Sequence, residues 1–322
     1  VAVFCLMVLG VRYQSLPFAT LQSNATSTSY GWGPVSFPAQ RAFSDGWSRW
    51  NFEGYEGKTT FSEYNGVVQA MKKLGEDPAH GCGHALWENS GDLNKYGTTM
   101  ALMLLPYWTD GCIGSMEGLF FEAAGSTPYH FISAAALSKQ SSNPVRELRY
   151  DNKDAVKGVG YMRMMGIRYY MGYTPEAIAK ADAQPDLTKV GTSGPWHLYE
   201  IADTAIVEPL SVQPVVVNER PGDKRERWLE IGTSYFQHMN EWAALPVDHG
   251  PDEWQRIDVA ADETRSVGVE GEPGREVDIV KAVEGSEIKT VSLDPVVVSD
   301  VKVEQESVSF TVDRVGVPVL VK

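Results

Sequence analysis

The chain has 322 residues, which is enough for about two domains. Hydrophobic residues make up 43% of it and charged residues 22%, as in folded globular proteins, and 9 Trp and 14 Tyr can fill a core. The net charge of −14 excludes the basic surface with which proteins bind nucleic acid, so we expect no nucleic-acid partner.

The first residues, Val1 to Val11, are almost wholly apolar. A membrane-spanning helix needs about 20 such residues, and a signal peptide would add a basic start and a small-residue cleavage site. We therefore expect residues 1–11 to be the end of a transmembrane helix, with a buried strand as the alternative. The chain starts with Val and stops inside the strand-like alternation "VSFTVDRVGVPVLVK", so we expect a fragment of a longer integral membrane protein.

No second apolar run of spanning length follows Arg12, so the rest of the chain is expected to lie on one side of the membrane. Few Lys or Arg follow the first run directly, which favours the extracytoplasmic side. Residues 12–60 are rich in Ser, Gly, Pro and aromatic residues and predict an extended layer. Its packing residues are expected to be Trp32, Trp47, Trp50 and Tyr55.

Residues 61–250 predict a mixed α/β domain. A helix is expected over Ser62–Leu74, where Ser62 can cap the first turn. Its apolar stripe is formed by Val67, Val68, Met71 and Leu74. The stretch "GCGHALWE" then predicts a strand.

Further elements of this domain alternate between helix and strand. A helix is expected from Asp151 or Asn152 to Gly166, and another after Thr174 as its cap. The first would turn inward Ala155, Val156, Val159 and Met162. Strands are predicted at "IRYYMGY", "WHLYEIA" and "VQPVVVN". A last helix would have on one face Trp228, Ile231, Tyr235, Met239 and Trp242.

Residues 251–322 have a different composition. From about Gln255, Val dominates, Gly and Pro recur, and "VKVEQESVSFTV" alternates with period two. This pattern is typical of small all-β domains. The predicted fold class is therefore a mixed α/β domain followed by an incomplete β-sandwich-like domain.

The cysteines predict one disulfide. Cys5 lies in the apolar run, which leaves Cys82 and Cys112 as an even pair in the expected extracytoplasmic region. Glycines beside both residues allow close approach of the two backbones. Closing a loop of about 30 residues would stabilise the fold by about 3 to 4 kcal/mol.

A metal site is the alternative interpretation of "HGCGHALWE". On a strand, His80, Cys82 and His84 would share one face, with Glu88 nearby. Zinc motifs draw paired ligands from two separate elements, however, and the chain offers no second pair. We therefore expect no metal here, and no cofactor, because the chain also lacks a phosphate-binding Gly-rich loop.

Three carboxylates are the candidate catalytic residues: Asp110, Glu117 and Glu122, all within "YWTDGCIGSMEGLFFEAAGSTPYHF". Glycosidases place two carboxylates across the substrate, beside aromatic residues. The simpler interpretation is that these acids accept hydrogen bonds from backbone amides in loops. Whether the chain is an enzyme is thus left open.

Candidate substrate-binding residues are the aromatic and imidazole side chains near those acids. They are Trp87, Trp108, Tyr129 and His130. Rings of this kind supply an apolar face together with a polar atom, as contact with a glycan requires.

Several longer phrases carry a family resemblance. "WSRWNFEGYEGK", "GCGHALWE", "MGIRYYMGY", "GPWHLYEIAD" and "DRVGVPVLVK" resemble the C-terminal extracytoplasmic region of actinobacterial polytopic membrane proteins. That group is described as related to 6-pyruvoyl-tetrahydropterin synthase and is similar to the GT-C and YfhO-like glycosyltransferases. The resemblance covers Trp47 to Lys322.

The resemblance implies an accessory extracytoplasmic domain of a glycosyltransferase-like membrane protein that acts in cell-envelope glycan assembly. Its partners would be its own transmembrane helices and a lipid-linked sugar or glycan. The catalytic acid of GT-C enzymes lies in an early extracytoplasmic loop, outside this region. The alternatives are a non-catalytic carbohydrate-binding or envelope-structural module, and a hydrolase that uses the acids named above.

Overall fold

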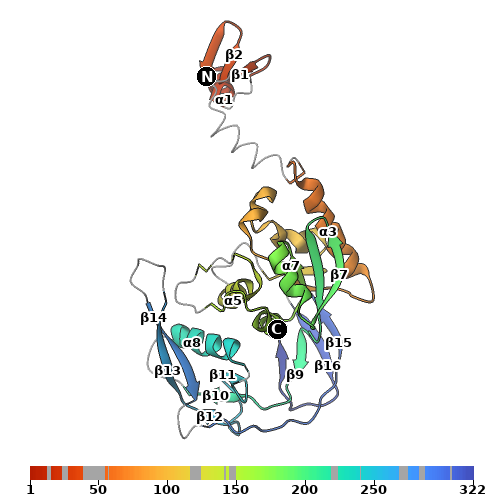
Figure 1. The fold of residues 1–322 in the computed structure, drawn as a ribbon, viewed down its shortest axis with the longest axis vertical. Coiled ribbons are helices and arrows are strands. Elements are labelled where there is room, and N and C mark those ends of the chain that lie inside the picture. The colour runs from red at the N-terminus through yellow and green to blue at the C-terminus, as the bar shows by residue number, and fades with distance from the viewer. Residues whose placement is uncertain are drawn as a thin grey trace. The chain divides into compact units, whose positions relative to one another are not determined.

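A computed structural model describes residues 1–12, 16–23, 28–38, 55–56, 58–116, 125–140, 143–144, 150–218, 224–239, 241–267, 275–282, 287–304 and 307–322. Within these residues the chain combines helices with several small sheets, which confirms the predicted mixture of α and β structure (Figure 1). Two compact units are formed: Val1–Ser62 with Lys95–Gly97, and Glu63–Asn94 with Thr98–Lys322.

The first unit contains a helix and an antiparallel three-stranded sheet. They are α1 (Ala2–Arg12), β1 (Thr20–Ser23), β2 (Thr28–Trp32) and β3 (Val35–Pro38). Trp32 belongs to the sheet, and its indole donates a hydrogen bond to the carbonyl of Pro17 at 2.8 Å. The other tryptophans expected in this layer, Trp47 and Trp50, lie outside the described residues.

The apolar N-terminal run is helical. Its side chains are largely exposed, among them Val3, Phe4 and Leu6. Within the described parts of the chain, no helix has both the length and the apolar character needed to cross a membrane.

A five-stranded sheet organises the second unit, in the order β5-β4-β6-β8-β7. Its strands are β4 (Gly83–Trp87), β5 (Ile113–Ser115), β6 (Ile167–Gly172), β7 (Leu187–Ser193) and β8 (Trp196–Ile201). The strands β5, β4 and β6 are parallel, and β8 and β7 are antiparallel to their neighbours. The strands predicted at "GCGHALWE", "IRYYMGY" and "WHLYEIA" are thus confirmed.

Helices cover this sheet because each has one apolar stripe. The helix α3 (Phe61–Glu76) buries the four predicted residues Val67, Val68, Met71 and Leu74. The helices α6 (Ala155–Met164) and α7 (Pro175–Asp182) contribute Val159, Met162 and Ala181 to a core with Leu86, Tyr170 and Tyr199 of the strands.

Caps fix where these two helices begin. The hydroxyl of Thr174 accepts a hydrogen bond from the amide of Ala177, as expected for α7. Asp154 caps α6, which therefore starts later than predicted.

The inward orientation predicted for Val156 was wrong, since its side chain is 72% exposed. The buried stripe of α6 runs through Ala155, Val159 and Met162, and Val156 lies one position off that stripe.

The remaining helices are short or pack together. They are η2 (Gly91–Tyr96), η3 (Ala101–Leu104), α4 (Leu105–Trp108), α5 (Thr127–Leu137) and α8 (Lys224–Gln237). Side chains of α5, α6 and α8 share a cluster that contains Ile132, Tyr161 and Phe236. Met239 and Trp242, expected on the last helix, follow its end.

Small ladders make up the rest of the second unit. A three-stranded parallel sheet has the order β11 (Pro246–Val247), β10 (Val215–Val217) and β12 (Arg256–Ile257). The antiparallel pairs are β13 (Val259–Val267) with β14 (Arg275–Ala282), β15 (Val298–Val303) with β16 (Val308–Val312), and β9 (Val207–Pro209) with β17 (Val319–Val321). Residues 251–322 are thus rich in strands, while their assembly as a sandwich stays a prediction.

Candidate ligand pocket

The predicted disulfide between Cys82 and Cys112 is present. It joins the residues that precede β4 and β5, with Cα atoms 4.7 Å apart. The helix α3 lies against it, since a Cβ atom at Gly75 would be 2.5 Å from the Cys112 sulfur. Glycine at position 75 is therefore required by the close approach of helix and disulfide.

The two histidines of "HGCGH" have different surroundings. His80 Nδ1 is 2.7 Å from a carboxylate oxygen of Glu200, and Arg168 donates to the other oxygen at 2.9 Å. His84 is half-buried, and this burial lowers the pKa of its imidazole, which favours the neutral form. Among the described residues, no three His, Cys, Asp or Glu side chains are grouped as a metal site would require.

Glu88 ends the same segment as a fully buried carboxylate. One oxygen accepts hydrogen bonds from the amides of Tyr173 and Thr174, at 2.9 and 2.7 Å. The other accepts from the Thr174 hydroxyl at 2.7 Å and from the Lys139 amide at 3.1 Å. Glu88 thus ties the end of β4 to the start of α7 and to the segment after α5, and its role here is structural.

The carboxylate candidates are not brought together by the described residues. Asp110 is exposed, has a left-handed backbone with φ of 53°, and pairs with Lys72 at 3.6 Å. Glu117 and Glu122 lie outside the described residues. Their catalytic role therefore stays a prediction.

Three of the four predicted substrate-binding residues lie within the fold. The Trp87 ring is 3% exposed and donates to the carbonyl of Thr99, so it has no open face for a ligand. Trp108 is half-buried, and its indole donates to the Tyr64 hydroxyl at 3.0 Å, but it does not line the pocket described next. His130 is buried in α5.

The fourth, Tyr129, lines a pocket of about 500 Å³ that we call the aromatic pocket. Four segments contribute to it: α5, the end of α6, α8 and the chain around β11. Its lining residues are Tyr129, Met164, Met165, Trp228, Gly232, Tyr235, Phe236, Leu245, Pro246, Val247 and Asp248. Tyr129, Trp228 and Tyr235 are only half-buried, so their rings combine packing with an accessible face.

Packing fixes the aromatic rings of this pocket. Tyr129 meets Phe236 edge to face, with ring centres 5.0 Å apart. Phe236 in turn stacks on Tyr161 at 4.6 Å. A Cβ atom at Gly232 would collide with the Tyr129 hydroxyl. Glycine at position 232 therefore provides the space that the Tyr129 ring occupies.

The polar groups of the pocket are phenols and one carboxylate. Burial raises the pKa of Tyr129, and burial followed by the Glu208 carboxylate raises the pKa of Tyr235. Both hydroxyls therefore stay protonated at neutral pH and can donate hydrogen bonds. Asp248 is exposed at the pocket and lies 2.9 Å from His249. A ligand here would meet apolar faces with a few hydrogen-bonding groups.

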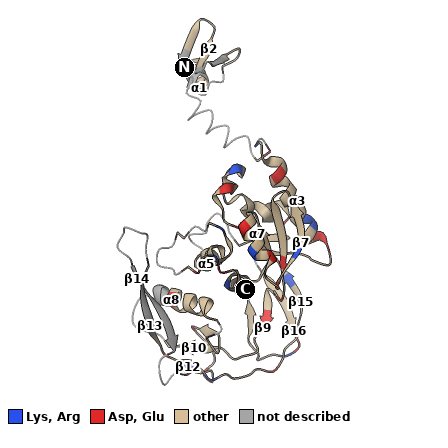
Figure 2. Cartoon of the chain, in the orientation of Figure 1, with Lys and Arg blue, Asp and Glu red and all other residues tan. Residues whose placement is uncertain are grey.

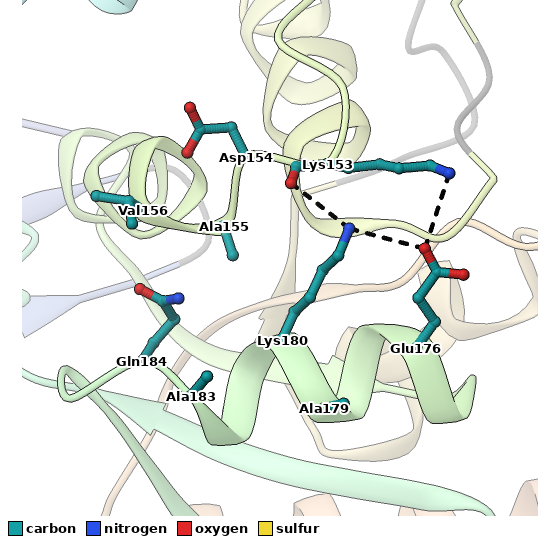
Figure 3. A pocket seen from close by; sticks show the side chains of 9 residues that line it. All are labelled: Lys153, Asp154, Ala155, Val156, Glu176, Ala179, Lys180, Ala183 and Gln184. Carbon is teal, nitrogen blue, oxygen red and sulfur yellow. Dashed lines mark hydrogen bonds and ion pairs between the residues drawn. The ribbon is translucent and has the colours of Figure 1, made fainter.

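A second hollow, of about 650 Å³, contains charged side chains and is more open to solvent. Figure 3 shows Lys153 and Lys180 directed toward Glu176, at 3.7 and 3.9 Å from one of its oxygens. The two ammonium groups share one carboxylate, so this hollow offers a solvated charge cluster beside small aliphatic side chains such as Ala155 and Ala179, and no aromatic ring lines it. The aromatic pocket is the better ligand site.

The sequence placed Trp228 and Tyr235 together on one face of a helix, and α8 carries both into the lining of the aromatic pocket. The signal was the spacing of the aromatic residues along one helix face, which did not show that they line a pocket. Asp248 was not identified, because it lies in a loop without a pattern.

No protein-family model matches this chain, and no curated protein or solved structure shows significant similarity to it. The site must therefore be interpreted from its own geometry.

Proposed function

We propose that this chain is an extracytoplasmic accessory region of a glycosyltransferase-like membrane protein, and that its aromatic pocket holds a sugar of the glycan or lipid-linked substrate. The observation that carries the proposal is the grouping of Tyr129, Trp228 and Tyr235 around one cavity. Its volume of about 500 Å³ lies within the usual range for small-ligand sites. In this proposal the chain binds sugar and takes no part in the chemical step.

Sugar rings suit such a site because they have apolar C–H faces and hydroxyl edges. Half-buried aromatic rings pack against the first, and tyrosine hydroxyls bond to the second. The Cys82–Cys112 disulfide supports the extracytoplasmic part of the proposal, because disulfides persist in oxidising compartments. The transferase part rests on the family resemblance described above.

Replacing Trp228 by alanine is expected to weaken sugar binding at least tenfold, because truncating a central aromatic residue of a site commonly costs about 1.4 kcal/mol or more. Isothermal titration calorimetry with methyl glycosides of glucose, galactose, mannose and N-acetylglucosamine measures this. Tyr107→Ala is the matched control, since Tyr107 is an aromatic residue of α4 that is 72% exposed and does not line the pocket.

Two outcomes would overturn the proposal: no glycoside binds the wild-type chain, or both substitutions weaken binding equally. If a glycoside binds but Trp228→Ala leaves sugar transfer by the full-length protein unchanged, the result favours the alternative, a carbohydrate-binding module that does not assist the transferase.

We also propose that α1 enters a lipid bilayer. Its side chains Val3, Phe4 and Leu6 are 71%, 71% and 68% exposed. A helix of 11 residues is about 16 Å long, roughly half of the hydrocarbon thickness. Burial of these side chains in lipid would remove a large apolar area from water.

The chain is expected to float with neutral phosphatidylcholine vesicles in a sucrose gradient, and the double substitution Phe4→Glu with Leu6→Glu should abolish this. Phe18→Glu provides the control, because Phe18 is also exposed, at 98%, but lies outside α1. Flotation of the double variant, or none of the wild type, would contradict the proposal.

A further inference from the structure

Among the described lining residues of the aromatic pocket, Asp248 is the one with a charged side chain. Asp248 lines it with a side chain that is 63% exposed, and its described partner is the more exposed His249. Figure 2 shows acidic colouring on β9. Glu208 of this strand raises the pKa of Tyr235 of the pocket and pairs with Lys322 at 2.6 Å. Among the lining residues that the structure describes, none is Lys, Arg or His.

We infer that the aromatic pocket selects sugars by charge, with Asp248 as the residue that determines specificity: amino sugars bind better than neutral sugars, and neutral sugars better than uronic acids. This inference rests on the proposed function, because it specifies which sugars the same pocket takes. A ligand carboxylate at the pocket would meet the like charge of Asp248. A ligand ammonium would meet an opposite charge instead.

The aromatic rings act in the same direction. An ammonium group is attracted by the face of Trp or Tyr, whereas a carboxylate is not. Trp228, Tyr129 and Tyr235 are the half-buried rings of the pocket and can provide such a face. A ring contact thus adds to the preference that Asp248 sets.

The charge effect is moderate because Asp248 is solvated. For one screened charge pair at an exposed site we expect about a fivefold change in affinity for each change of ligand charge. Low ionic strength, near 0.02 M, keeps the screening length longer than the pocket, so the effect is measured there.

The test is calorimetric titration of the whole chain at pH 7 with three probes: the methyl glycosides of glucosamine, glucose and glucuronic acid. The wild-type chain should bind them in that order of affinity, with steps of about fivefold. In Asp248→Asn the step from glucoside to glucuronide should shrink to less than twofold, while the step from glucosaminide to glucoside keeps the part that the rings supply. In Asp248→Lys the glucuronide should bind better than the glucoside. Asp252→Asn is the matched control and should keep the wild-type order, because Asp252 is exposed, pairs with Arg256 and does not line the pocket.

The outcomes separate this inference from the proposed function. If methyl glucoside binds but glucuronide binds as tightly, or if Asp248→Asn keeps the fivefold step between glucoside and glucuronide, the charge selection by Asp248 is overturned and sugar binding stands. If none of the three glycosides binds, the proposed function fails and this inference fails with it.

Discussion

Replacing Glu88 by glutamine is expected to lower the free energy of unfolding by about 3 kcal/mol, the largest effect we predict for a single side chain. Its buried carboxylate accepts four hydrogen bonds, two on each oxygen. A glutamine amide nitrogen at either position would face two donors and accept from neither. Hydrogen bonds to a buried charged group are worth about 1.5 to 3 kcal/mol each, and unsatisfied donors add their desolvation penalty. Urea unfolding monitored by circular dichroism provides the measurement.

Glu176→Gln is the matched control, because Glu176 lies in the first turn of α7, the helix whose start Glu88 binds, but its side chain is 41% exposed. Its two ion pairs with lysines are solvated, so the expected loss is less than about 0.5 kcal/mol. Equal losses for the two variants, or a loss below about 1 kcal/mol for Glu88→Gln, would refute the structural role of this carboxylate.

Removal of the disulfide by the double substitution Cys82→Ser and Cys112→Ser is expected to lower the free energy of unfolding by about 3.5 kcal/mol. The bond closes a loop with a sequence separation of 30, and constraint of the unfolded chain over such a loop accounts for this magnitude. The folded state should lose little else, because β4 and β5 remain paired through their backbones. The urea midpoint of the double variant should match that of the wild-type chain treated with reductant.

Cys5→Ser controls for the loss of a thiol, since Cys5 is a free, exposed cysteine of α1. The Cys5→Ser variant should unfold at the same urea midpoint as the wild-type chain, both when the two are compared without reductant and when they are compared with it. A double variant as stable as the oxidised wild-type chain would show that the disulfide contributes nothing to stability.

Local patterns in the sequence were sufficient to predict several helices of the second unit. The stripe of Val67, Val68, Met71 and Leu74 predicted α3, and Thr174 predicted the start of α7. These features depend on residues within four positions of one another, which a helix brings onto one face. The error at Val156 arose because the true cap, Asp154, was not identified and the helix face was drawn too wide.

The pocket could not be predicted in the same way because its residues meet only through tertiary packing. Tyr129, Met164, Trp228 and Asp248 come from separate segments, and no spacing rule relates them. The role of Glu88 depends likewise on Lys139 and Tyr173, which the fold brings to it from distant positions. Trp87 and Trp108 are of the residue type that binds ligands. The sequence did not show that their indole N–H groups donate hydrogen bonds to other parts of the fold.

The strand pairing of the five-stranded sheet also determines how much chain entropy is lost when each pair of strands forms. His84 of β4 pairs with Ile167 of β6 across 83 positions, whereas Tyr170 of β6 pairs with Tyr199 of β8 across 29. For a flexible chain the longer closure costs about 0.9 kcal/mol more. The pairing of β6 with β8 is therefore of low contact order, and the pairing of β4 with β6, which Glu88 adjoins, is the one whose formation topology slows.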